Sequence, residues 1–208
     1  MKEHVMIEEM VIKDYLNLLS TKNPVPGGGS VAGVNAAQGM GLVLMVLDLT
    51  EGKEKYKEFA KENLKIKEEA LDLFEQLKKA ADEDVQAFSK VADAYKISKD
   101  DPNKPIEIGK ASLGATKAPF QLMAKSLEGC KLTEKLIGKT NKTAISDLAV
   151  AAFCFESAAK SAWLNVKINL SFLLDEKDKE YFNNNGQKIL DEIAELSSDI
   201  NERILALL

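Results

Sequence analysis

Apolar residues recur at helical spacing along almost the whole sequence, and no stretch alternates between apolar and polar residues as a half-buried strand would. This pattern predicts an all-α fold, a single up-and-down helical bundle of about six helices. We expect these helices over residues 7–20, 30–50, 57–97, 105–137, 142–174 and 176–208. Pro119 is expected to bend the fourth helix, and the run Asn183–Gly186 could break the sixth. At this length we expect one domain over residues 1–208.

The charge balance and the cysteines narrow the classes of partner and cofactor. The net charge is -5, and the only run of repeated lysines, residues 53–67, is interleaved with glutamates, so we expect no nucleic-acid partner. Cys130 and Cys154 have no second Cys or His at ligand spacing, which argues against a metal site and a disulfide framework. A cytoplasmic protein without a metal is therefore expected. The single histidine, His4, lies near the N-terminus, so we expect no Ser-His or Cys-His nucleophile.

The predicted helix over residues 30–50 is apolar on nearly all sides. Because Asn35, Gln38 and Asp48 interrupt it, fewer than about 18 consecutive apolar residues are available to span a membrane. We expect a central or interface helix, and no membrane partner. Its many glycines and alanines would let another helix or a ligand approach the backbone closely.

A carboxylate lies on the apolar stripe of the predicted helix over residues 57–97. At about 100° per residue, Asp84 falls in one narrow sector with six apolar side chains. These are Ile66, Leu73, Leu77, Phe88, Val91 and Tyr95. An ionised carboxylate is costly to bury without a partner. Asp84 is therefore expected to be paired, hydrogen-bonded or chemically used.

The predicted helix over residues 142–174 repeats this anomaly. Asp147 and Asn165 lie about five turns apart on one face. Only small side chains such as Ala151, Cys154 and Ala158 stand between them. This face could form a groove for a flat ligand or a seat for another helix. Because Asp147 lies near the start of its helix, an ordinary role as a helix cap is the alternative.

Three glycines stand immediately before the predicted second helix, in the sequence PVPGGGS at residues 24–30. Backbone N–H groups there would lie at the positive end of the helix dipole and would suit a carboxylate or a phosphate. No predicted strand precedes this turn and no GK[ST] follows it, so it matches neither a dinucleotide-binding fingerprint nor a P-loop. Taken alone, the turn is equally consistent with a simple cap.

Four segments together resemble the cyclodeaminase domain of formiminotransferase-cyclodeaminase and its stand-alone bacterial relatives, which include methenyltetrahydrofolate cyclohydrolases. The segments are PVPGGGS at residues 24–30, DVQAF at 84–88 with AYK at 94–96, NKTAISD at 141–147 and LNVKINL at 164–170. Four motifs in the right order are far more specific than any one of them. The resemblance covers most of the chain.

This resemblance implies an all-helical homodimer whose substrate is a tetrahydrofolate carrying a one-carbon unit. It implies no metal or redox cofactor. The reaction would be closure of 5-formiminotetrahydrofolate to 5,10-methenyltetrahydrofolate with release of ammonia, or hydrolysis of 5,10-methenyltetrahydrofolate to 10-formyltetrahydrofolate. A non-catalytic folate-binding or structural helical dimer is the alternative.

The resemblance also gives roles to the candidate site residues. Asp84 would be the general base, because burial would raise its pKa towards neutrality. Lys96 would donate a proton or hold the folate glutamate, unless it is simply solvated. Asp147 would bind the pterin ring or stabilise the cationic methenyl carbon, together with Asn141, Ser146, Asn165 and Asn169. The turn formed by Gly27, Gly28, Gly29 and Ser30 would shape the folate pocket or hold the glutamate tail of the folate.

Overall fold

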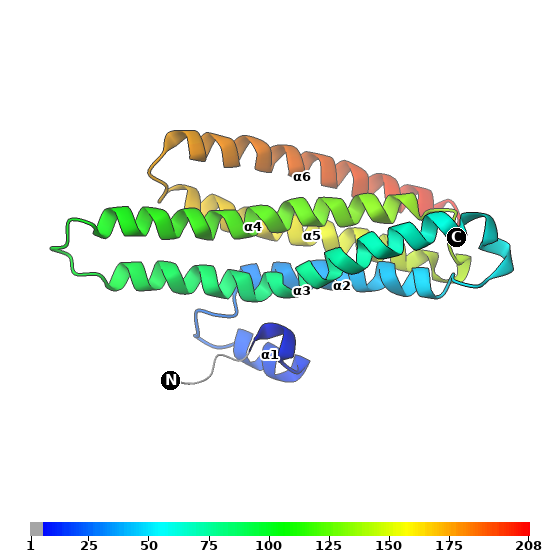
Figure 1. Cartoon of the computed structure of the whole chain (residues 1–208), viewed down its shortest axis with the longest axis horizontal. Coiled ribbons are helices and arrows are strands. Elements are labelled where there is room, and N and C mark those ends of the chain that lie inside the picture. The colour runs from blue at the N-terminus through cyan, green and yellow to red at the C-terminus, as the bar shows by residue number, and fades with distance from the viewer. Residues whose placement is uncertain (1–5) are drawn as a thin grey trace.

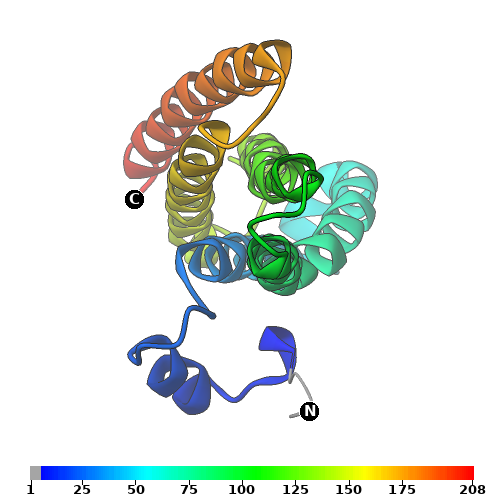
Figure 2. The ribbon, with the colours of Figure 1, turned by 90° about the vertical axis from the view of Figure 1, so that its left-hand side faces the viewer.

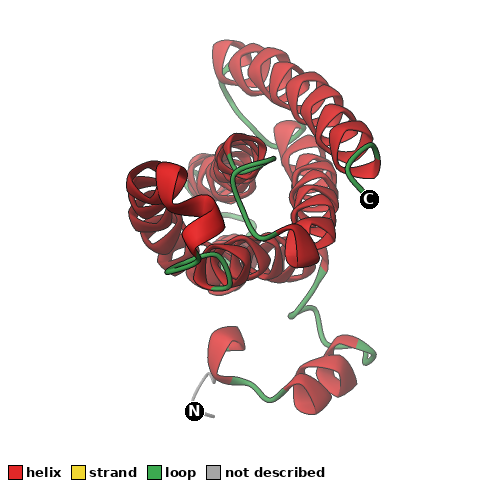
Figure 3. Cartoon of the chain, turned by 90° about the vertical axis from the view of Figure 1, so that its right-hand side faces the viewer, coloured by secondary structure: helices red, strands yellow, loops and turns green. Residues whose placement is uncertain are grey.

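The computed structural model describes residues 6–208, and it contains α-helices and short 3-10 helices with no strand among those residues (Figure 3). The α-helices are α1 (Ile12–Leu19), α2 (Gly28–Asp48), α3 (Ala60–Lys96), α4 (Lys104–Lys135), α5 (Ile145–Leu170) and α6 (Glu176–Leu205). The 3-10 helices are η1 (Ile7–Glu9), η2 (Glu54–Phe59) and η3 (Lys142–Ala144). The predicted all-α class is confirmed. His4 lies outside the described residues.

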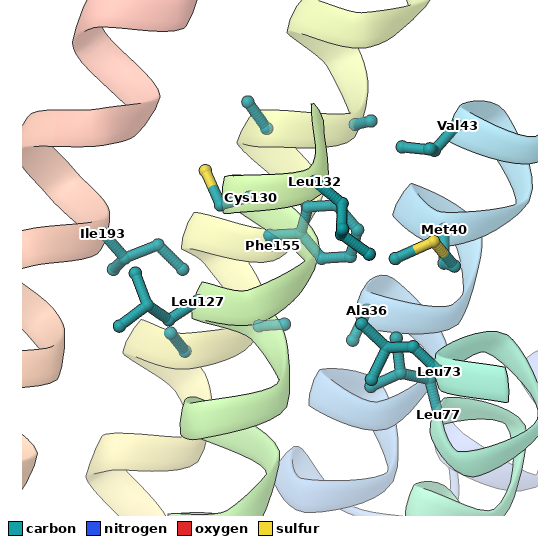
Figure 4. Packing of buried hydrophobic residues seen from close by; sticks show 14 of the residues in the cluster. Ala36, Met40, Val43, Leu73, Leu77, Leu127, Cys130, Leu132, Phe155 and Ile193 are labelled. Atoms are coloured by element: carbon teal, nitrogen blue, oxygen red, sulfur yellow. The ribbon is translucent and has the colours of Figure 1, made fainter. Parts of the chain in front are cut away.

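The long helices pack side by side around one apolar core (Figure 1). Phe155 of α5 is completely buried, near Met40 of α2 and Leu132 of α4 (Figure 4). A side chain on Gly39 of α2 would place its Cβ 3.1 Å from this ring, and one on Gly129 of α4 would place it 2.6 Å away. Both neighbouring helices therefore need a glycine to reach Phe155 at this spacing.

Two predicted boundaries were wrong. Residues 7–20 do not form one helix, because Met10 and Val11 are extended and separate η1 from α1. The run Asn183–Gly186 does not break α6, which continues through it. Gly186 is instead a contact point with α5, since a Cβ there would lie 2.2 Å from the ring of Trp163.

Helix α2 is a core helix, as predicted. Among the described residues it alone is long and apolar enough to cross a membrane by length and composition, and half of its apolar window is buried. Its buried face packs against α3 and α5. This packing accounts for its apolar composition.

The segment before α2 stands apart from the bundle (Figure 2). We call residues 6–27 the N-terminal arm. Its helix α1 contains no buried residue, and Ile12 is 77% exposed. The arm contacts the bundle through a small cluster in which Ile7 packs with Ala81 and Val85 of α3. Few apolar contacts therefore hold the arm in place.

Candidate functional site

Asp84 lies directly against the glycine turn, residues 27–30, where α2 begins. A side chain on Gly29 would place its Cβ 1.9 Å from one carboxylate oxygen of Asp84 and 2.5 Å from the other. The α2 backbone can approach Asp84 this closely only because residue 29 is a glycine. Two features that the sequence marked separately are therefore in contact.

The half-buried Asp84 has an altered acidity. Burial raises the pKa of its carboxyl above the ordinary value, and hydrogen bonds from the Ser30 hydroxyl and backbone N–H act in the opposite direction. The same hydroxyl lies 3.4 Å from the Ala81 carbonyl oxygen, which is long for a hydrogen bond between oxygens. A carboxyl group with a raised pKa is suited to taking up and returning a proton.

Asn165 of α5 reaches the same end of the bundle. Its side-chain nitrogen lies 3.7 Å from the position of a Cβ on Gly28, an ordinary van der Waals distance, and donates to the Ser161 carbonyl at 2.9 Å. The N-cap of α2 is Gly27, which has no side chain of its own to cap the first N–H groups of this helix. We call Asp84, the glycine turn and Asn165 the Asp84 cluster.

The apolar stripe of α3 changes character at Asp84. Leu73 and Leu77, which precede it, are buried in the core. Phe88 and Tyr95, which follow it, are 42% and 48% exposed. The end of α3 extends beyond the start of α2, so α2 does not cover this stretch (Figure 1). The stripe is therefore core up to Asp84 and an exposed apolar surface beyond it.

Lys96 does not join the Asp84 cluster within one chain. Twelve residues of helix separate the two positions, which corresponds to a rise of about 18 Å. The Lys96 side chain is exposed and forms an ion pair of 2.7 Å with Asp93. Lys96 is therefore solvated within one chain, which was the alternative to its predicted role in proton donation or glutamate binding.

Asn169 has a structural function that the sequence analysis missed. Pro119 has no N–H to donate to the Ala115 carbonyl one turn earlier in α4. The Asn169 amide donates to that carbonyl at 3.0 Å and to the Asn165 carbonyl at 2.9 Å. Both hydrogens of the amide are therefore used inside the bundle. α4 continues through Pro119, and α5 supplies a donor for the free carbonyl.

The remaining predicted site residues lie at the other end of the bundle. Asn141 is buried, and its backbone N–H donates to Thr50 Oγ1 at 2.9 Å, which joins the end of α2 to the start of α5. Ser146 is exposed and Asp147 is half-buried in the first turn of α5. About 27 Å of helix separates Asp147 from Asn165. One chain therefore carries two separate clusters, and we call Ser146 and Asp147 the Asp147 cluster.

The face between Asp147 and Asn165 is closed by α2. Ala158 is completely buried, and a Cβ on Gly39 of α2 would lie 3.1 Å from Cys154 Cβ. Of the two interpretations that the sequence allowed, the seat for another helix is therefore correct, and the groove for a flat ligand is wrong within one chain.

The two cysteines are unsuited to nucleophilic chemistry. Burial, reinforced by the charges of Glu156 and Glu134, raises the pKa of the Cys130 thiol to about 12. Burial also raises the pKa of the Cys154 thiol. A thiol is a weak nucleophile while it is protonated. Neither cysteine belongs to the Asp84 cluster. In that cluster the carboxyl of Asp84 is the group placed to move a proton.

Asp82 was not among the predicted residues. It is 3% exposed, and the N–H groups of Ile7 and Glu8 donate to its two oxygens at 2.7 Å and 3.4 Å. Two helical residues turn through about 200°, so Asp82 faces nearly away from the side that Asp84 faces. The helical pattern of α3 could not reveal its burial, because the cover comes from the N-terminal arm.

Known proteins resemble this chain along most of its length. The family model for formiminotransferase-cyclodeaminase matches residues 11–188. The methenyltetrahydrofolate cyclohydrolase of Methylorubrum extorquens is 32% identical, over 93% of this chain and 93% of its own. The formimidoyltransferase-cyclodeaminase of Mus musculus is 26% identical over 87% of this chain, which covers 34% of that longer protein.

A solved structure agrees over almost the whole length. The crystal structure of formiminotetrahydrofolate cyclodeaminase from Thermotoga maritima superposes with a TM-score of 0.81 at 28% identity, and 97% of each chain is covered. The family model, the relative of 32% identity and this fold match all indicate the family that the four sequence motifs resemble. The chain belongs to the formiminotransferase-cyclodeaminase family.

Proposed function

We propose that this protein is an enzyme of folate one-carbon metabolism. Its substrate is a tetrahydrofolate that carries a one-carbon unit at N5 or between N5 and N10. The reaction is either cyclodeamination of 5-formiminotetrahydrofolate to 5,10-methenyltetrahydrofolate or hydrolysis of 5,10-methenyltetrahydrofolate to 10-formyltetrahydrofolate. Family membership supports this substrate class, because the compared relatives are named for these activities. The observation that carries the proposal is the contact between Asp84 and the glycine turn.

Both reactions need the same proton transfers. In cyclodeamination, N10 attacks the formimino carbon, its proton is removed, and ammonia leaves after protonation. In hydrolysis, water attacks the methenyl carbon and loses one proton. The bond from that carbon to N5 then breaks as N5 is protonated, and the remaining hydroxyl proton is released to solvent as the formyl C=O forms. Asp84 takes the first proton and returns it to the departing nitrogen, which a carboxyl of raised pKa does efficiently. Neither reaction requires a metal or a redox cofactor.

The separation of the two clusters supports a homodimer. An antiparallel arrangement of two chains would bring the Asp147 cluster of one chain to the Asp84 cluster of the other, as a twofold axis permits. Large apolar side chains are exposed on α2, at its C-cap and on α5, the helices that link the two ends. They are Met45, Leu49, Val150, Phe153, Leu164 and Ile168. Such residues favour a protein interface.

The first experiment is a direct assay. Purified protein is incubated separately with 5-formiminotetrahydrofolate and 5,10-methenyltetrahydrofolate, while methenyl absorbance and free ammonia are followed. Ammonia release with methenyl formation identifies a cyclodeaminase, and loss of methenyl absorbance identifies a cyclohydrolase. Asp84→Asn should abolish the activity found. Asp93→Asn, which changes an exposed carboxylate on the same helix, is the matched control and should stay near the wild-type rate. Folded protein that accelerates neither reaction would refute the proposal.

Mixed dimers test whether the two clusters belong to one site. Asp84→Asn and Asp147→Ala should each be inactive as homodimers. If each site takes Asp84 from one chain and Asp147 from the other, a randomly mixed dimer population regains about a quarter of wild-type activity, because half of the dimers hold one intact site. No recovery after verified subunit exchange would place both residues in one chain's site or remove Asp147 from it.

We also propose that the protein acts in the cytoplasm.

A further inference from the structure

Asp82 is a buried carboxylate whose hydrogen-bond partners come from the N-terminal arm. The Ile7 N–H donates to Asp82 Oδ1 at 2.7 Å, and the Glu8 N–H donates to Oδ2 at 3.4 Å. Among residues 6–208 no lysine or arginine pairs with it. A carboxylate that is 3% exposed is largely cut off from water and depends on such N–H donors for its hydrogen bonds. The two N–H groups belong to the first turn of η1, where helical N–H groups lack partners within the helix.

The arm connects Asp82 to the helix that packs on Asp84. Its first residues bind Asp82, and its last residue, Gly27, is the N-cap of α2, whose Gly29 packs on Asp84. Between these two points the arm adds Met10, Tyr15 and Val25 to the apolar cluster around Ala81 and Val85. These two residues stand on either side of Asp82 and Asp84 in α3. The arm bound at Asp82 is therefore continuous with the glycine turn over Asp84.

Little else holds the arm in place. Helix α1 contributes no buried residue, and Val11, Ile12 and Leu16 are between 54% and 77% exposed. The buried Tyr15 hydroxyl has no hydrogen-bond partner among residues 6–208, so it adds no polar attachment within that range. The two bonds to Asp82 are thus the arm's principal polar attachment to α3.

We propose that Asp82 is a positioning residue for the reaction at Asp84: it fixes the N-terminal arm to α3 and thereby holds the glycine turn against the Asp84 carboxylate. Asp82 does not touch the substrate. This inference rests on the proposed function for its kinetic consequences, whereas its structural consequence is independent of any activity.

The test compares Asp82→Ala with Asp82→Asn. Alanine removes both acceptors, whereas asparagine keeps one acceptor oxygen for the short bond from Ile7 and loses the second. Asn63→Ala is the matched control, because it removes a buried tertiary hydrogen bond of 3.0 Å to the Lys139 carbonyl at the far end of α3. Amide hydrogen exchange is measured on peptides covering residues 6–20, 21–34 and α5, and kinetics are measured with the folate substrate that the wild type turns over.

In Asp82→Ala, we expect faster exchange in residues 6–34 with unchanged exchange in α5. The value of kcat/KM should fall by about tenfold or more, the effect of losing a hydrogen bond to a charged group. Asp82→Asn should recover part of both effects, and the control should retain wild-type exchange in residues 6–34. Unchanged exchange in residues 6–34 of Asp82→Ala would overturn the attachment. This readout does not depend on activity, so it applies even if the wild type does not turn over folates. If Asp82→Ala shows faster amide exchange in residues 6–34 but keeps the wild-type kcat/KM, the positioning role is overturned and the proposed function stays intact.

Discussion

The contact between Gly29 and Asp84 allows a single methyl group to test the whole site. In Gly29→Ala the new Cβ would lie 1.9 Å from one oxygen of Asp84 and 2.2 Å from its carboxyl carbon. Ordinary contact begins at 3.4 Å, so the carboxylate must move by about 1.5 Å, and misplacement by about 1 Å costs on the order of 100-fold in rate. We therefore expect kcat to fall by about 100-fold or more.

The fold should survive this substitution. The clashing atoms belong to the end of the Asp84 side chain, which can rotate, and not to backbone. Alanine is also a better helix former than glycine by about 1 kcal/mol, which offsets part of an overpacking cost of about 1–3 kcal/mol. Circular dichroism and thermal unfolding should show a folded bundle with a small change in Tm.

Gly28→Ala is the matched control for this prediction. It adds the same methyl group one residue earlier, where the nearest atom is Asn165 Nδ2 at 3.7 Å, an ordinary contact. We expect kcat within about threefold of wild type, since no catalytic group has to move. The substitution Gly29→Ala should also add no further loss in an Asp84→Asn background, because both changes remove the same carboxylate from its place. A folded Gly29→Ala enzyme with wild-type kcat would refute the assigned role of Asp84.

Three further predictions concern stability. Because burial raises the pKa of Asp84, its ionised form destabilises the folded state, so Asp84→Asn should unfold at a higher urea concentration than wild type near neutral pH. That difference should shrink as the pH falls and vanish well below about 4, where an ordinary aspartate is neutral in the unfolded chain too. Asn169→Ala should lower the unfolding free energy by about 1–3 kcal/mol, and adding Pro119→Ala should recover much of this loss by restoring the helical donor; no recovery would refute the paired roles. Gly186→Ala should cost about 1–3 kcal/mol despite its better helix propensity and should shift the fluorescence of the only tryptophan, whereas a stabilised variant would contradict the contact.

The sequence predicted the fold class and the family well, because both depend on features that are continuous along the chain. Helical periodicity located the long helices to within a few residues, and the four motifs identified a family that the comparisons confirm. Asp84 stood out because a carboxylate on an apolar stripe violates a local pattern. Its partner, Gly29, was marked separately, by the PVPGGGS motif.

The arrangement of the site depended on contacts that no local pattern contains. The spacing of Asp147 and Asn165 indicated a shared face, but it did not show that α2 occupies that face. Asn169 looked like a ligand contact because its structural partner, the carbonyl freed by Pro119, lies on another helix. Asp82 was missed for a similar reason, since its cover returns from the start of the chain.

The buried ring of Phe155 links three positions that are far apart in the sequence. The three atoms nearest to a Cβ on Gly129 all belong to this ring, whereas a Cβ on Gly39 would also lie 3.0 Å from the Ala151 carbonyl oxygen. A smaller residue at 155 alone would leave a cavity, which is costly. In a randomised library we therefore expect replacements at 129 and 155 to appear together, as combinations that conserve the total volume, while position 39 stays glycine.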